Sequence, residues 1–294
     1  RYIKKLTSGE MTLRQVFLED QIVYVENEST FKRARRLFLK HSPLPVARSN
    51  YYVSGAGGAG KGVVSKALAR SIYPELTDDE CYFVVGDGKV AFDNYDGQPV
   101  IIWDDWRAAD LLSKFDRGTI WKIFAINPEK VSQNVKHGEV VLANTFNIVN
   151  CVDTFEKFIN DLAGEYVDSN KVKHKAEDPN QGYRRFPLFI NVAPDSFDLY
   201  ASMALTGGEM RDYQKIVNMQ VNTVALAKND TLENEKKVME PLLTVTKKVR
   251  EIHGDNADEK VAIDSIMSVE ENDLSKQLGL FDSEDVIEGE FTEK

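Results

Sequence analysis

One glycine-rich stretch sets the architecture of this chain: Gly55-Ala56-Gly57-Gly58-Ala59-Gly60-Lys61-Gly62. A short apolar run, Tyr51-Tyr52-Val53, precedes it, and a helical pattern over residues 61–72 follows it. Glycines allow consecutive backbone N–H groups to point at phosphate oxygens, the helix N-terminus adds a favourable dipole, and Lys61 reaches the β and γ phosphates of a nucleotide. The stretch therefore predicts a phosphate loop between a strand and a helix. A plain glycine-rich turn is the alternative.

The residue after the lysine departs from the usual phosphate-loop pattern. That position commonly carries a Ser or Thr whose hydroxyl ligates magnesium, whereas this chain has Gly62. Ser65, about one helical turn later, is the substitute ligand that the sequence offers. The phosphate loop is thus predicted with a changed set of metal ligands.

Two adjacent carboxylates, Asp104 and Asp105, follow the apolar run Val100-Ile101-Ile102-Trp103. At the end of a neighbouring strand, one carboxylate would hold Mg²⁺ and the other would orient or deprotonate the attacking water. We assign Asp104 to the metal and Asp105 to water activation. The alternative is that both acids only cap a helix that begins near Trp106.

Polar and basic residues at three later positions complete the candidate site. A third apolar run ends in Asn150, which we expect to sense the γ phosphate. Lys136 and His137 form the tip of a predicted hairpin and would grip a sugar-phosphate backbone, with a solvated turn as the simpler interpretation. Arg184 and Arg185 precede an apolar strand. Arginine stabilises the charge of phosphoryl transfer, often from a neighbouring subunit, and a structural ion pair is the alternative.

Apolar periodicity divides the chain into four regions. Residues 1–45 predict short helices that end at prolines. Strand and helix patterns alternate over residues 46–194, which indicates a mainly parallel sheet covered by helices. Residues 195–253 read as helical throughout, and residues 254–294 are acidic and poor in aromatic side chains, as is typical of a disordered tail.

The formal net charge of −10 is concentrated in that tail. From Glu251 to Lys294 there are 14 acidic residues and 3 lysines. The first fifty residues instead contain 10 Lys or Arg and 5 acids. A basic cluster of this kind faces phosphates or is the solvated face of an ordinary helix. Its members are Lys32, Arg33, Arg35, Arg36 and Lys40.

Composition and the chain's opening exclude several classes of protein. A chain of 294 residues with 42% hydrophobic content supports a packed core. No apolar run approaches the roughly 18 residues of a spanning helix, and no apolar signal stretch opens the chain, so we expect a soluble cytoplasmic protein with no membrane partner. Cys81 and Cys151 lie in apolar runs, which favours buried thiols in a reducing compartment.

The order of these motifs resembles that of a superfamily 3 DNA helicase, a member of the AAA+ class of ring ATPases. The motifs are the phosphate loop, the Asp104-Asp105 pair, the Lys136-His137 hairpin, the polar strand end and the downstream arginines. In particular they resemble the helicase half of rolling-circle replication initiator (Rep) proteins of bacterial plasmids, integrated elements and circular single-stranded DNA viruses. The resemblance covers about residues 50–192.

The resemblance implies an α/β fold, a AAA+ type P-loop ATPase with a central, mainly parallel five-stranded sheet. A small N-terminal helical oligomerisation collar would span residues 1–45, the ATPase domain 46–194, a C-terminal helical region 195–253 and the acidic tail 254–294. Full-length Rep proteins usually carry an upstream nicking domain. Because residue 1 is Arg, we expect that domain to have been removed, and we expect no endonuclease activity from these residues.

The implied activity is ATP-dependent helicase action with Mg²⁺, in a homo-hexameric ring that translocates on single-stranded DNA. It would unwind a plasmid or mobile-element replicon during rolling-circle replication. Lys136 and His137 would contact DNA in the pore, and Arg184 or Arg185 would act in trans. The nucleotide would be bound by Gly55, Gly57, Gly58, Ala59, Gly60, Lys61 and Gly62.

The tail contains one apolar island, Gln277-Leu278-Gly279-Leu280-Phe281. It resembles the short peptide by which bacterial replication proteins bind the sliding clamp of the replicative polymerase, which would make the host bacterial. Leu280 and Phe281 would fill an apolar pocket beside a hydrogen bond from Gln277. A turn that folds back on the ATPase is the alternative.

The sequence is also compatible with two other functions. A AAA+ DNA-remodelling or packaging ATPase would keep the nucleotide site and need no unwinding by Lys136 and His137. A small-molecule P-loop kinase would act as a monomer without DNA, and would leave the hairpin, the paired arginines and the clamp-like peptide unexplained.

Overall fold

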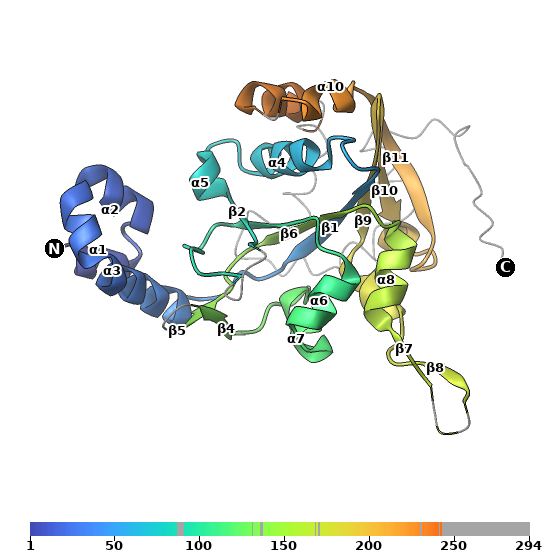
Figure 1. Ribbon diagram of the computed structural model, residues 1–294, viewed down its shortest axis with the longest axis horizontal. Coiled ribbons are helices and arrows are strands. Elements are labelled where there is room, and N and C mark those ends of the chain that lie inside the picture. Colours follow the sequence, from blue (N-terminus) through green and yellow to red (C-terminus); the bar gives the residue numbers. More distant parts are fainter. Residues whose placement is uncertain are drawn as a thin grey trace.

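The computed structural model describes residues 1–86, 91–130, 132–135, 138–167, 169, 171–229, 231–240 and 242. An N-terminal bundle of helices stands beside a larger α/β body, and the long helix α3 runs from the bundle to the body (Figure 1). No described helix is both long and apolar enough to cross a membrane.

Local capping sets the boundaries of the three helices in the bundle. Thr12 and Gln15 form a capping box at the start of α2, and Asp20 accepts a hydrogen bond from the backbone N–H of Val23 at the start of α3. Gly9, with φ of 77°, ends α1 in the left-handed conformation. The helices predicted before residue 45 are present, but α3 is one helix of 21 residues and not a short one. Their bounds are α1 (Tyr2–Ser8), α2 (Leu13–Glu19) and α3 (Gln21–His41).

The apolar residues of α3 divide between two environments, although the sequence indicates a single face. Phe31 and Ala34 are buried in the bundle core. Phe38 packs against the core of the body, and Leu37 is 45% exposed. The reason is that α3 contacts α1 and α2 on one side and the body on the other.

A seven-stranded sheet forms the centre of the body, in the order β11-β10-β9-β1-β6-β3-β2. The five strands from β9 to β2 are parallel, and β10 and β11 pair antiparallel at one edge. The mainly parallel sheet is confirmed, whereas five is too few strands for the whole sheet. The strands are β1 (Ser49–Gly55), β2 (Tyr82–Val84), β3 (Val100–Asp104), β6 (Phe146–Cys151), β9 (Leu188–Ala193), β10 (Ser196–Ser202) and β11 (Tyr213–Gln220).

The two additional strands lie in the region where helices throughout were expected. In β10, Phe197 and Leu199 are buried and the residues beside them are partly exposed, which is the two-residue period of a strand. The register shifts between Leu199 and Tyr200, and this irregularity interrupts the alternation. The helical expectation was therefore wrong for β10 and β11, and between them only a short 3₁₀ helix, Met203–Thr206, is helical. Helices return at α10 (Thr223–Ala227) and over residues 232–240.

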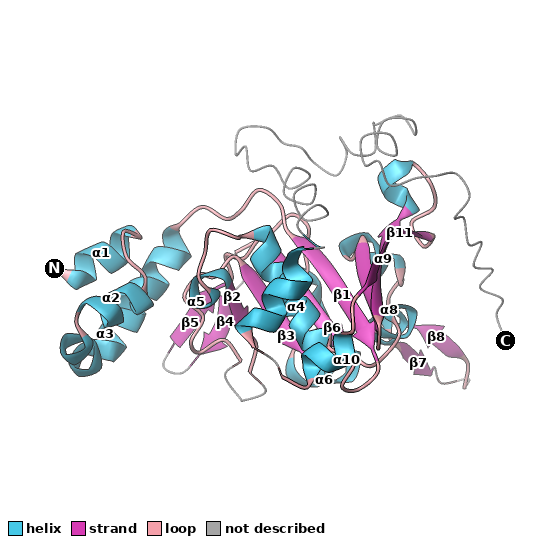
Figure 2. Ribbon diagram, turned by 90° about the horizontal axis from the view of Figure 1, so that it is seen from above, coloured by secondary structure: helices cyan, strands magenta, loops and turns pink. Residues whose placement is uncertain are grey.

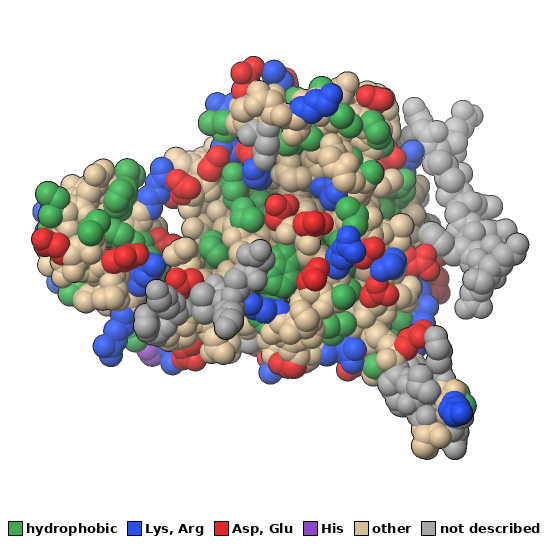
Figure 3. Space-filling model, in the orientation of Figure 1, with side chains coloured by type: hydrophobic (Ala, Val, Ile, Leu, Met, Phe, Trp, Pro, Cys, Tyr) green, Lys and Arg blue, Asp and Glu red, His purple; other side chains and the backbone are tan. Residues whose placement is uncertain are grey.

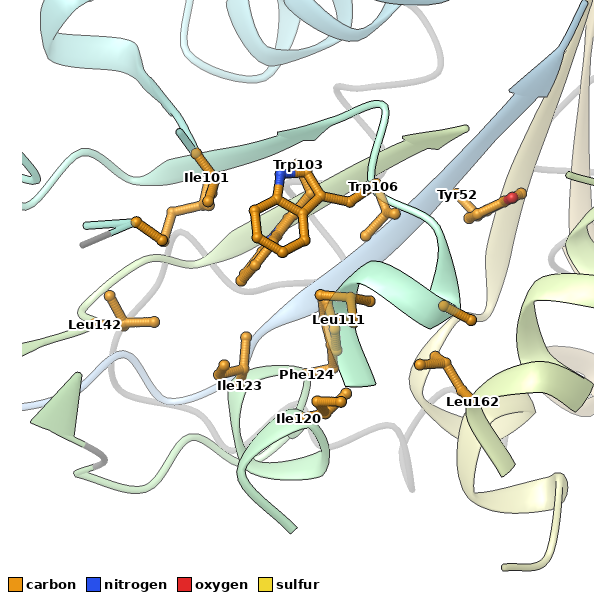
Figure 4. Packing of buried hydrophobic residues seen from close by; sticks show 14 of the residues in the cluster. Tyr52, Ile101, Trp103, Trp106, Leu111, Ile120, Ile123, Phe124, Leu142 and Leu162 are labelled. Atoms are coloured by element: carbon orange, nitrogen blue, oxygen red, sulfur yellow. The ribbon is translucent and has the colours of Figure 1, made fainter. Parts of the chain in front are cut away.

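Helices cover both faces of the sheet (Figures 1 and 2). The helices α4, α5 and α10 lie over one face, and α6, α7 and α8 lie over the other. Side chains of β3 alternate between the two layers: Ile102 packs toward α4, while Trp103 packs on the opposite face near Leu111 of α6 (Figure 4). The remaining bounds are α4 (Lys61–Ile72), α5 (Asp78–Cys81), α6 (Ala108–Lys114), α7 (Arg117–Ile123), α8 (Phe155–Ala163), α9 (Asn180–Arg185), β4 (Ser132–Val135), β5 (Gly138–Val141), β7 (Glu165–Val167) and β8 (Lys173–Lys175).

A buried arginine ties the start of β1 to α7 and to the loop after β5. Arg48 is 2% exposed and donates hydrogen bonds to the carbonyl groups of Ile123, Leu142 and Asn144. Burial lowers the pKa of this guanidinium to about 10. Because Ile123 is the last residue of α7, Arg48 satisfies a carbonyl at a helix C-terminus, where a positive charge is favourable.

Candidate nucleotide site

The phosphate loop leaves the central strand β1 and leads directly into α4. Gly58 has φ of 73°, and a Cβ atom placed on it would meet nothing within 4 Å. Gly60 has φ of 95°, and a Cβ atom there would come within 2.8 Å of the backbone oxygen of Thr223. Glycine is thus required by backbone conformation at both positions and by the approach of α10 at the second. The space above Gly58 leaves the loop backbone open to a phosphate group.

Lys61 lies at the first position of α4, folded over the loop. Its Nζ atom donates hydrogen bonds to the carbonyl oxygens of Gly55 and Ala56, both at 3.0 Å. Within the described residues, no carboxylate forms an ion pair with this ammonium group. The charge is therefore held in place by neutral groups, from which it can turn to an anionic ligand.

The two carboxylates predicted from the sequence lie at the carboxyl end of the sheet, beside Asn150. β3 and β6 are parallel neighbours, and Asp104 and Asn150 are partners in their register. The amide of Asn150 donates to Asp104 Oδ1 at 2.8 Å and to Ser65 Oγ at 3.2 Å, while its Oδ1 accepts from the backbone N–H of Asp105 at 2.9 Å. The structure thus brings together Ser65 of α4, Asp104 of β3, Asn150 of β6 and Asp105, which directly follows β3.

These bonds define what Asn150 does in this structure. A side-chain amide has two N–H donors, and both are engaged by protein groups. The residue is also 1% exposed. Asn150 therefore orients the carboxylate of Asp104 and fixes the backbone of Asp105, and its contact with a γ phosphate stays a prediction.

Asp105 adopts a backbone conformation that is uncommon for a residue with a side chain. Its φ is 57°, and such left-handed residues cost of order 1–3 kcal/mol and cluster at functional sites. Its side chain is exposed. The helix that follows begins at Ala108, with Arg107 as its N-cap and Asp110 completing the cap. The alternative in which Asp104 and Asp105 merely cap this helix is therefore wrong.

Gly62 faces the carboxylate side of the site. A Cβ atom built on it would lie 3.9 Å from Asp104 Oδ1, which is ordinary contact distance. The hydroxyl of Ser65 is buried and bonded to Asn150. Ser65 therefore supports Asp104 through Asn150 in this arrangement, and the position usually filled by a metal-binding hydroxyl is open.

The two downstream arginines lie at the end of α9 in different environments. Arg185 donates to the backbone oxygens of Trp121 and Gln181 at 3.2 and 2.7 Å, and its guanidinium lies 5.2 Å from the centre of the Trp121 ring. Burial lowers its pKa to about 10. Arg184 is exposed and bonds to the side chain of Gln181 at 3.1 Å. Arg185 thus fastens α9 to α7, and Arg184 is the more accessible of the pair.

The predicted hairpin is present as β4 and β5, which pair antiparallel with Val135 opposite Gly138. Its expected DNA-binding residues, Lys136 and His137, lie outside the described residues. The tail residues Gln277, Leu278, Leu280 and Phe281, the acidic tail and residues 243–253 lie outside them as well.

Sequence reasoning missed the contact between the phosphate loop and the C-terminal part of the body. The backbone oxygen of Thr223 abuts Gly60, and the Thr223 hydroxyl bonds to the carbonyl of Ala193 at the end of β9. Farther along α4, the buried Glu235 pairs with Arg70 at 2.7 Å and Lys66 at 3.8 Å. No sequence motif identifies these residues, because they are distant from α4 in the sequence and contact it only in the folded protein.

A family model described as RNA helicase matches residues 51–143. The matched segment contains the phosphate loop, both carboxylates and the hairpin. Together with the mostly parallel sheet, the match indicates a helicase-type P-loop domain that binds a nucleotide, a function that typically uses a divalent metal. A search of curated proteins finds no match.

Proposed function

We propose that this chain is the ATP-dependent motor of a superfamily 3 helicase that unwinds nucleic acid as a hexameric ring. The observation that carries the proposal is the convergence of the phosphate loop, Asp104 and Asn150 at one end of a parallel sheet. Ligands bind at the carboxyl ends of such strands, where the connections diverge. Here β1 lies between β6 and β9, so the loop that follows it opens at that point.

The residues present fit a nucleotide with magnesium. The open backbone at Gly58 and the first turn of α4 would hold the phosphates, and Lys61 would exchange its two carbonyl partners for phosphate oxygens. Asp104, oriented by Asn150, would hold Mg²⁺ without the help of a side-chain hydroxyl at position 62, which is glycine. Bound Mg²⁺ neutralises charge on the transferred phosphoryl group. Asp105 would accept a proton from the attacking water.

Ring assembly is supported by exposed apolar residues on the bundle. Leu18, Ile22 and Val25 are 61%, 73% and 70% exposed, and hydrophobic side chains are visible over the outer surface of the bundle in Figure 3. Apolar surface of this kind favours contact with another copy of the chain. Arg184 would reach the nucleotide of the adjacent subunit, because its guanidinium is accessible.

Mixed rings test this arrangement. An inactive Arg184→Ala subunit mixed with an inactive Lys61→Ala subunit should recover part of the ATP turnover, because each supplies the group that the other lacks. Native mass spectrometry would verify that mixed rings form. Mixed rings without recovery would contradict a trans role for Arg184.

DNA is the substrate expected from the Rep resemblance, and RNA is the second candidate because the matching family model is described as RNA helicase. Unwinding of matched DNA and RNA duplexes with single-stranded tails separates the two. Rep-type action on DNA predicts faster unwinding of the DNA duplex, and the reverse preference would reassign the substrate. The setting in a plasmid or mobile-element replicon is part of the same proposal.

The clamp-binding peptide is tested separately. Leu280→Ala with Phe281→Ala should weaken binding of the full chain to a bacterial sliding clamp and leave ATP turnover unchanged, since both residues lie in the tail. Equal clamp affinity of the variant and the original chain would remove this partner from the account.

A further inference from the structure

A groove of about 760 Å³ lies between α3 and the hairpin β4–β5. One wall is the basic part of α3, and the other includes Gly138 and Glu139 at the start of β5. The helix and the strand approach closely here, because a Cβ atom on Gly138 would lie 3.5 Å from the guanidinium of Arg36. The groove is separate from the nucleotide site, since the phosphate loop contributes none of its lining residues.

Cations recur along the α3 wall at the period of the helix. Lys32, Arg36 and Lys40 follow one another at intervals of four residues, so they form a row that advances by about 6 Å, slightly more than one turn, each time. Arg33 lies beside the row and is exposed. A row of evenly spaced charges matches a polymer with repeating phosphates better than it matches a single anion.

Carboxylates hold the row in exchangeable ion pairs. Lys32 pairs with Glu28 at 2.9 Å, Arg36 pairs with Asp93 at 3.7 Å, and Lys40 pairs with Glu139 at 2.7 Å. The Lys40 pair is exposed on both sides, and exposed ion pairs contribute about 0–1 kcal/mol, so a phosphate can displace Glu139 at little cost. The side chains of Lys32 and Arg36 are less exposed than that of Lys40. Arg33 forms no ion pair within the described residues, and it is available to a phosphate directly.

The lining favours the backbone of a single strand over its bases. Ser29 and Thr30 add hydroxyl groups that donate to phosphate oxygens. None of the described lining residues is aromatic, so the groove has no platform on which a base would stack. Recognition there is therefore electrostatic and independent of nucleotide sequence.

We propose that this groove binds the sugar-phosphate backbone of single-stranded nucleic acid as it passes beside the hairpin. The inference rests on the proposed helicase function and adds to it a binding track on α3, away from the nucleotide. The strand would lie along Lys32, Arg36 and Lys40, with Arg33 as a further phosphate contact.

Salt dependence of binding tests the track. Fluorescence anisotropy would follow labelled single-stranded DNA and RNA oligonucleotides on the full chain at several salt concentrations. Arg33→Gln with Lys40→Gln should weaken binding by about tenfold and reduce the slope of log K against log salt by about 1.4, since each lost phosphate contact accounts for about 0.7 on single strands. ATP turnover without nucleic acid should not change.

A matched control removes the same charge elsewhere. Lys4 on α1 and Lys122 on α7 are exposed and lie outside the groove. Lys4→Gln with Lys122→Gln should leave the slope at its original value. An equal reduction of the slope in this control would overturn the track, because binding would then reflect the overall charge of the protein.

A variant that is expected to strengthen binding separates the effect of the groove from a folding defect, which would only weaken binding. Glu28→Gln removes a carboxylate that pairs with Lys32, so it should strengthen binding several-fold. Unchanged affinity and slope in both groove variants, with the original chain binding normally, would overturn the track and leave the helicase proposal intact. Failure of the original chain to bind either oligonucleotide would instead contradict the helicase proposal itself.

Discussion

The phosphate loop and the α3 groove both offer cations to an anionic ligand, but they hold these cations in different ways. Lys61 is restrained by two carbonyl oxygens of its own loop. Lys32 and Lys40 are restrained by carboxylates on partly exposed surface. Neutral restraint keeps one charge ready for one phosphate group in a fixed geometry, whereas exchangeable ion pairs allow a long anion to bind and move on.

The two regions also differ in how deeply the residues around their cations are buried. Next to the phosphate loop, Asp104 is fixed through Asn150, whose amide is buried and fully bonded. In the groove, the side chains of Lys40 and Glu139 are 52% and 47% exposed. Catalysis requires the catalytic groups to be positioned within a fraction of an ångström. A nucleic-acid strand that moves along the protein instead requires weak contacts that exchange easily.

Loss of the restrained lysine should have the largest effect. Lys61→Ala is expected to lower ATP turnover by at least about 100-fold, because the variant lacks the charge that meets the β and γ phosphates. Thermal unfolding should change little. The matched variant Lys40→Ala should keep its turnover in the absence of nucleic acid, and equal losses in both variants would remove the distinction between the two regions.

Disturbing the support of Asp104 should have the next largest effect. Asn150→Asp places a second carboxylate at the position of the amide, removes both donors, and should lower turnover by roughly 10- to 100-fold. The Mg²⁺ concentration needed for half-maximal nucleotide binding should also change. Unaltered Mg²⁺ dependence would show that Asn150 does not act through Asp104.

The paired arginines should separate activity from stability. Arg184→Ala should reduce turnover in the assembled protein with an unchanged melting temperature. Arg185→Ala should lower the free energy of unfolding by about 1–3 kcal/mol, because the backbone oxygens of Trp121 and Gln181 lose a charged donor. If Arg185→Ala instead lowered turnover at an unchanged melting temperature, and Arg184→Ala lowered the free energy of unfolding, Arg185 would be the active arginine and Arg184 the structural one.

Restoring a hydroxyl beside Asp104 should have the smallest effect. Gly62→Ser should reduce the Mg²⁺ requirement for nucleotide binding several-fold, since its Cβ fits 3.9 Å from Asp104 Oδ1. Gly62→Ala is the control, because it shares the gain of about 0.5–1 kcal/mol in helix stability and lacks the hydroxyl. Equal Mg²⁺ requirements in the two variants would contradict a metal beside Gly62.

Local patterns were sufficient for the parallel part of the sheet and for the location of the candidate nucleotide site. Glycine spacing placed the loop before α4, and apolar runs ending in Asp104 and Asn150 placed the two polar strand ends. Parallel strands bring such ends together without further information. Asn150 was thus found from its position at a strand end, while its bonds to Asp104 and Ser65 required the register of the strands.

Features that depend on tertiary contacts could not be predicted from local sequence patterns. The register shift between Leu199 and Tyr200 interrupted the two-residue period of β10, and the antiparallel edge was mistaken for helix. Thr223 and Glu235 reach α4 from distant sequence, and no motif precedes them. The sequence marked the basic cluster near Lys32, but only the packing of α3 against β5 makes it one wall of a groove.

ATP hydrolysis with and without single-stranded DNA or RNA, measured together with particle mass in the same buffer, tests the central claim most directly. We predict that nucleic acid stimulates turnover and that the active particles contain close to six subunits. Turnover by a monomer that is indifferent to both nucleic acids would contradict the account and would instead support a phosphate-loop kinase that acts on a small molecule.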